Sequence, residues 1–155
     1  MTSHTNFDSA IRTRWLCNER ADRAATLYTM LEPFGGAVDD SEILKTLRGT
    51  CSQPLSVVAR WIVDRRVLHL PWGSAIFFPS FQFASDGRGG AYQPIPGVHR
   101  ALMELDGIFD ELELVEWFAK PNNWLSSRAP AALVGMDADC VALAARADRY
   151  IANGW

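Results

Sequence analysis

The spacing of hydrophobic residues along the chain predicts a mainly α protein. Phe7, Ile11 and Trp15 recur every four residues, as on one face of a helix, and a charged, alanine-rich sequence follows them. We therefore expect one or two helices over residues 7–31. A Pro-Phe-Gly-Gly sequence then breaks the pattern, so residues 1–36 are predicted to form an N-terminal helical arm.

Two short helices and a β-hairpin are predicted for residues 37–97. Ser41 suits the N-cap of the first helix, and Pro54 suits the first position of the second. Residues 67–70 and 75–79 are short apolar runs around a glycine-containing loop, a pattern typical of a hairpin. A hairpin that directly follows two such helices indicates a helix-turn-helix or winged-helix-like unit.

Helical spacing of apolar residues returns over residues 98–155. The apolar side of residues 112–119 is broad, so that helix is expected to pack on more than one face, with Trp117 in the core. Asp137 or Asp139 is suited to cap the last helix. We predict that this part of the chain forms a helical, partner-binding domain.

A sharp corner is predicted inside that domain. Pro121 ends the preceding helix, because proline lacks an N–H and restricts the residue before it. Asn122 and Asn123 suit the turn, since their side chains bond to nearby backbone and tolerate left-handed dihedral angles. Trp124 follows the turn at once, and we expect it to face a partner.

The composition is that of a folded chain with unevenly distributed charge. The 155 residues are 48% hydrophobic and 21% charged, enough for one ordinary domain or two small ones with a buried core. The net charge is −3, yet residues 41–66 hold five bases against two acids, and residues 104–116 hold six acids and no base. This asymmetry indicates either two different partners or two solvated faces.

The sequence predicts a cytoplasmic protein without membrane, metal or cofactor sites. No apolar run approaches the roughly 20 residues of a membrane span, and no apolar signal core follows Met1. Cys17, Cys51 and Cys140 are distant in sequence and odd in number, which fits neither a zinc site nor a disulfide framework. The three histidines lie in unrelated segments, and no nucleophile–base pair or phosphate-binding loop is present, so we do not expect an enzyme.

Two kinds of contact residue follow from these predictions. If residues 41–66 form a helix-turn-helix, the start of its second helix exposes side chains that read bases, and basic residues after it meet phosphates. The candidate DNA contacts are Ser52, Gln53, Ser56, Arg60, Arg65 and Arg66. In the last third of the chain, aromatic and arginine side chains suit a protein interface. The candidate protein contacts are Trp124, Arg146, Arg149, Tyr150 and Trp155.

The C-terminal sequence resembles the toxin-binding domain of the MbcA/ParS/Xre antitoxin family. The resemblance rests on a tryptophan-bearing helix, a Pro-Asn turn, a proline-bearing link and a final helix that ends in Ile-Ala-Asn-Gly. The matching positions are Trp117, Pro121, Asn122, Leu125, Pro130, Leu133, Val141, Ala145 and residues 151–154. The convincing part covers about the last 60 residues, with weaker similarity back to about Pro54.

The resemblance implies a type II antitoxin that binds a RES-domain, NAD-degrading toxin and occludes its active site. It also implies an N-terminal unit that supports a homodimer and binds operator DNA, and here that unit looks closer to a MerR-like unit than to an Xre domain. The alternative interpretation is a sequence-specific DNA-binding regulator that acts through residues 41–66.

Overall fold

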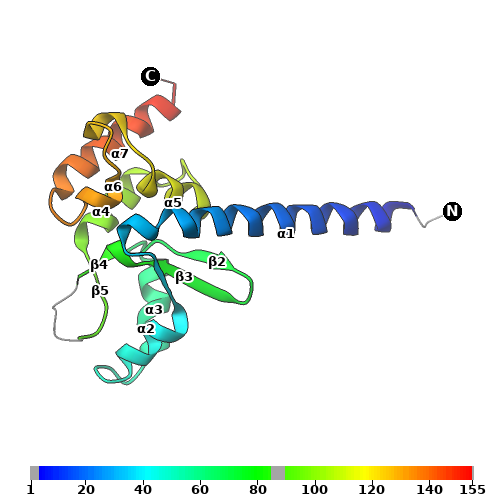
Figure 1. The fold of residues 1–155 in the computed structure, drawn as a ribbon, viewed down its shortest axis with the longest axis horizontal. Coiled ribbons are helices and arrows are strands. Elements are labelled where there is room, and N and C mark those ends of the chain that lie inside the picture. Colours follow the sequence, from blue (N-terminus) through cyan, green and yellow to red (C-terminus); the bar gives the residue numbers. More distant parts are fainter. Residues whose placement is uncertain (1–3, 85–89, 155) are drawn as a thin grey trace.

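A computed structural model describes residues 4–84 and 90–154, with side chains from residue 16 onward, and the prediction of a mainly α protein is confirmed. None of the described helices is both long and apolar enough to cross a membrane. The elements, shown in Figure 1, are α1 (His4–Met30), η1 (Glu32–Phe34), β1 (Ala37–Asp39), α2 (Asp40–Leu47), α3 (Pro54–Val63), β2 (Leu70–Trp72), β3 (Ala75–Pro79), η2 (Ser80–Gln82), β4 (Phe83–Ala84), β5 (Gln93–Pro94), α4 (Pro96–Glu104), α5 (Glu111–Ala119), η3 (Asn123–Leu125), α6 (Pro130–Leu133) and α7 (Ala138–Ala152).

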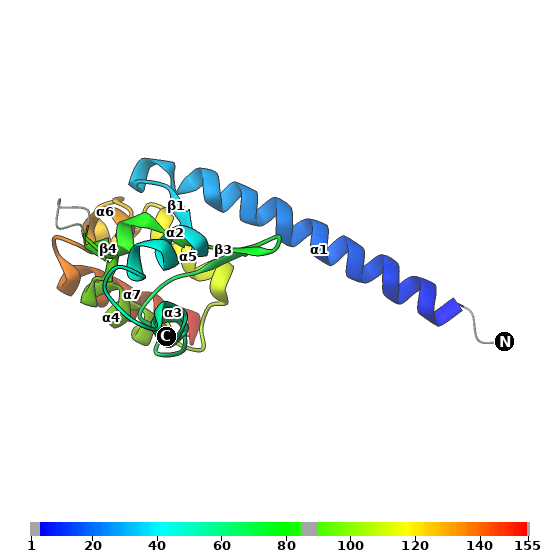
Figure 2. The ribbon, with the colours of Figure 1, turned by 90° about the horizontal axis from the view of Figure 1, so that it is seen from below.

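The N-terminal helix α1 projects away from the rest of the molecule. It is one helix of 27 residues, about 40 Å long at 1.5 Å per residue. Only its C-terminal end joins the body, where Ala24, Leu27 and Leu31 are buried, and the two ribbon views show the rest extending outward (Figures 1 and 2). The side chains of Phe7, Ile11 and Trp15 lie outside those the structure describes.

A three-stranded antiparallel sheet has the order β1-β3-β2. Trp72 of β2 pairs with Ala75 of β3, and β1 pairs with the other edge of β3, where Val38 faces Phe78. The ring centroid of Tyr28, near the end of α1, lies 5.6 Å from that of Trp72, so aromatic packing ties α1 to the sheet.

Two hydrophobic cores hold the chain together. The larger one combines the end of α1 with Leu68, Leu70 and the helices α4 to α7. The smaller one lies between α2, α3 and the sheet, around Ile43, Val58 and Phe78. The larger core thus draws residues from all three segments, 1–36, 37–97 and 98–155.

Buried and capping polar groups fix the connections between these elements. Gln82 is fully buried and makes two hydrogen bonds to the backbone of Leu68. Its side-chain oxygen accepts the Leu68 N–H at 2.6 Å, and its side-chain N–H donates to the Leu68 carbonyl at 2.9 Å. The predicted N-cap Ser41 is wrong, because the N-cap of α2 lies two residues earlier, at Asp39, which accepts the Glu42 N–H at 2.9 Å. That hydrogen bond is the main reason why the pKa of Asp39 lies below its usual value.

Candidate partner-binding surface

Asn122 fixes the corner after α5, and this residue is only 8% exposed. Its side-chain oxygen accepts the backbone N–H of Trp124 at 2.9 Å. Its own backbone N–H donates to the Arg128 carbonyl, and its carbonyl accepts the Ser127 N–H. The left-handed residues here are Ser126 and Ser127, with φ of 55° and 62°. Asn122 itself is extended, with φ of −118°, because it pairs with Arg128 like a strand residue.

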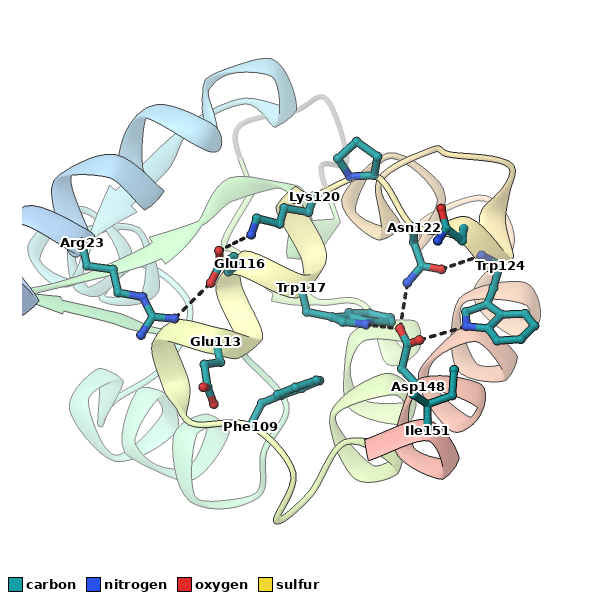
Figure 3. Close-up of a pocket in the computed structure, with 12 residues that line it drawn as sticks. Arg23, Phe109, Glu113, Glu116, Trp117, Lys120, Asn122, Trp124, Asp148 and Ile151 are labelled. Atoms are coloured by element: carbon teal, nitrogen blue, oxygen red, sulfur yellow. Dashed lines mark hydrogen bonds and ion pairs between the residues drawn. The ribbon is translucent and has the colours of Figure 1, made fainter. Parts of the chain in front are cut away.

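Asp148 of α7 binds this corner to the helices. Its Oδ2 accepts the indole N–H of Trp117 at 2.7 Å and the Asn122 side-chain N–H at 2.9 Å. Its Oδ1 accepts the indole N–H of Trp124 at 2.9 Å (Figure 3). The sequence did not point to Asp148, since its three partners lie 24 to 31 residues away and only the fold brings them together.

A groove of about 490 Å³ opens between α5 and α7 beside this carboxylate. Its apolar lining comes from Phe109, Trp117, Trp124 and Ile151. Trp117 is half-buried and contacts Phe118 edge-on at 4.9 Å between ring centroids, so it serves both the groove and the core. Trp124 is 56% exposed although two hydrogen bonds hold it in place.

Charged side chains line the other side of the groove. Arg23 from α1 lies 3.0 Å from Glu116, and Lys120 forms an ion pair with the same carboxylate. The hydrogen bond from Lys120, and then that from Arg23, keeps the pKa of Glu116 below its usual value. Glu113 instead accepts the backbone N–H of Asp110 at 2.8 Å, which completes the capping box of α5.

Arg146, Arg149 and Tyr150, which were also predicted as protein contacts, do not line this groove. Arg146 points toward α4, where its Nη2 lies 2.7 Å from Glu104 Oε1. That hydrogen bond is the first cause of a pKa of Glu104 below its usual value, and Arg149 adds to it. Arg149 and Tyr150 are exposed, the latter at 56%, and Trp155 lies outside the described residues. The structure therefore places Trp124 at the groove and Arg146 on the edge of α7 that faces α4.

The predicted DNA contacts also divide into two groups. Four of them line one hollow of about 320 Å³ at the start of α3, beside Trp61, and these are Ser52, Gln53, Ser56 and Arg60. Arg65 has φ of 54° and pairs with Asp106 at 3.2 Å, so its guanidinium is directed toward the body of the protein. Arg66 is exposed and makes no ion pair with the described residues.

The remaining reactive side chains are scattered. Among the described residues, no three His, Cys, Asp or Glu side chains are close enough to hold a metal ion, and Cys17, Cys51 and Cys140 carry free thiols. His69 lies 3.9 Å from Glu111, and burial lowers the pKa of its imidazole. The groove beside Asp148, by contrast, brings three side-chain N–H groups to one carboxylate.

Comparison of this chain with protein-family models, with curated proteins and with solved structures found no match.

Proposed function

We propose that this protein is the antitoxin of a type II toxin–antitoxin pair and that it neutralises a RES-domain, NAD-degrading toxin by binding and occluding its active site. Support comes from the order of motif residues between Trp117 and Gly154, which resembles the MbcA/ParS/Xre toxin-binding domain. In this proposal the protein has no catalytic role, and its surface at the corner after α5 meets the toxin.

The observation that carries the proposal is the state of Trp124. Tryptophan residues are highly buried on average, yet this one is 56% exposed. Hydrogen bonds at its backbone N–H and its indole N–H hold it in one orientation. A fixed aromatic side chain loses little conformational freedom on binding, which is the property of an interface anchor.

The test is co-expression with a RES-domain toxin encoded next to this gene. We expect a stable complex on size-exclusion chromatography and loss of NAD hydrolysis by the toxin. Trp124→Ala should weaken the complex about 30-fold, since an anchor contributes about 2 kcal/mol. Leu55→Ala is the matched control, because Leu55 is also apolar and 70% exposed but lies on α3.

Failure to form a complex, or unchanged NAD hydrolysis within a stable complex, contradicts this function. Equal weakening by Trp124→Ala and Leu55→Ala would show that the corner after α5 is not the toxin-binding surface.

The second candidate function is sequence-specific DNA binding by the helix-turn-helix-like unit of residues 41–66. It is favoured by the hollow at the start of α3, where Gln53 and Arg60 are exposed beside two serines. Glutamine and arginine hydrogen-bond to base edges, and arginine also neutralises phosphates.

A gel-shift titration with the protein's own promoter tests this candidate. We expect binding that weakens steeply with salt, and loss of sequence preference in Arg60→Ala. Arg149→Ala is the control, because it removes an equally exposed arginine from α7. If no promoter fragment is shifted, the DNA-binding function is excluded, and the proposal of toxin binding still stands.

A further inference from the structure

We propose that the groove between α5 and α7 receives an arginine side chain from the protein partner. This inference rests on the proposed function and deepens it, since it names the chemistry by which the toxin is recognised.

The groove has an excess of negative charge. Its charged side chains are three carboxylates, Glu113, Glu116 and Asp148, and two cations, Arg23 and Lys120, for a net charge of −1. Both cations pair with Glu116. Glu113 and Asp148 accept hydrogen bonds only from uncharged N–H groups, and neither has an ion-pair partner among the described residues. Two carboxylates at the groove are therefore open to a cation.

Aromatic rings lie between these two carboxylates. In the view of Figure 3, Phe109 and Trp117 occupy the space between Glu113 on α5 and Asp148 on α7, and Trp124 flanks Asp148 on its far side. Aromatic faces attract cations through their quadrupole, and tryptophan does so most strongly. The lining thus favours the same sign of charge as the carboxylates.

A guanidinium group fits both features better than other cations do. It is planar, stacks on aromatic rings and presents several N–H donors in a fixed arrangement, so one group can contact a ring and the carboxylate beside it at the same time. Each carboxylate retains acceptor capacity, because a carboxylate accepts about four hydrogen bonds and Asp148 accepts three. An apolar side chain would cover the rings and leave both carboxylates without a counter-charge.

The direct test uses the full chain and N-acetyl-arginine-N-methylamide as the probe. We expect saturable shifts of the Trp117 and Trp124 indole N–H signals in NMR spectra. The citrulline analogue has nearly the same shape without the charge and should give no saturable shift. Equal shifts with the citrulline analogue, or equally tight binding of the lysine analogue, would overturn the assignment to a guanidinium.

A charge-neutralising variant tests the role of the groove. Glu113→Gln removes one open carboxylate and keeps the capping box of α5, because glutamine also accepts the N-cap N–H. We expect the dissociation constant of the arginine probe to rise about threefold, the size expected of a partly exposed charge pair. Glu111→Gln removes the same charge from the same helix, outside the groove, and should leave the constant unchanged. Equal behaviour of the two variants refutes the proposal.

Binding of the toxin separates this inference from the proposed function. If the arginine probe binds but no toxin does, the antitoxin function fails and the groove remains a guanidinium site. If the toxin binds the original protein and Glu113→Gln equally well, the inference fails and the antitoxin function stands.

Discussion

The carboxylates on the two edges of helix α7 have different kinds of partner. On the edge toward α4, Arg146 pairs with Glu104 at 2.7 Å and Arg100 pairs with Asp139 at 2.6 Å, so each carboxylate has a cationic partner. On the edge toward the corner after α5, the Asp148 carboxylate bonds only to uncharged indole and amide N–H groups. On the first edge each of these carboxylates has an ion-pair partner, whereas Asp148 has none in the part of the chain that the structure describes.

The two edges also differ in how closely the chain packs against α7. At the α4 edge the backbones approach so closely that a Cβ on Gly97 would lie 2.8 Å from that of Ala138. At the other edge lie a groove, an exposed tryptophan and the Asp148 carboxylate, which has no ion-pair partner among the described residues. We infer that both edges stabilise the fold and that the groove edge, in addition, meets the partner.

The largest effect on stability is expected from Asp148→Ala. It removes the acceptor of three N–H groups, of which those of Trp117 and Asn122 are partly buried. We expect the free energy of unfolding to fall by about 3 kcal/mol, because buried donors without partners are costly. Urea denaturation measures it. Asp139→Ala on the α4 edge is the control. If it lowers the free energy of unfolding as much as Asp148→Ala does, the predicted difference between the two edges is wrong.

The next largest effect is expected from Gly97→Ala. The added methyl group would meet Ala138 and the Val134 carbonyl at under 3.0 Å, so α4 and α7 must move apart. We expect a loss of about 2 kcal/mol in the free energy of unfolding, typical of overpacking. Gly135→Ala is the matched control, since a Cβ there has nothing within 4 Å. Equal stability of both variants would show that close packing does not hold the α4 edge.

The smallest effect is expected from Arg146→Ala. Arg146 is exposed, although its partner Glu104 is partly buried, so we expect the loss of stability at neutral pH to be the smallest of the three. The pKa of Glu104 is lower in the folded state than its usual value of 4.5. Its ionised form therefore stabilises the fold above pH 4.5, and this contribution is lost as the pH falls through the folded-state pKa. Thermal denaturation at pH values around and below 4.5 should show that acid lowers the stability of Arg146→Ala less steeply than that of the original protein. Parallel curves would contradict this account of the pair.

Local features of the fold could be predicted from the sequence. Pro54 and Pro130 begin α3 and α6, and Asp137 caps α7 by accepting the Cys140 N–H, because these signals act within one turn of a helix. The strand β1 was not predicted, since its pairing with β3 joins residues 40 apart, such as Val38 and Phe78.

The candidate site was predictable only in part. Trp124 stood out because it directly follows a Pro-Asn-Asn turn, and the structure places it exposed at the groove. Arg146 lies on the same helix as Asp148, yet its role depends on Glu104, which the sequence spacing does not indicate. Asp148 itself carries no signal in the sequence, because its importance comes from partners on two other elements.

Photo-crosslinking tests most directly whether the groove edge meets the partner. A benzoyl-phenylalanine residue would replace either Asn123, exposed at the groove, or Met103, 49% exposed on the α4 edge, in the complex with the RES-domain toxin. We expect the protein labelled at Asn123 to crosslink to the toxin and the protein labelled at Met103 not to do so. A crosslink from Met103 with none from Asn123 would contradict the assignment of the two edges.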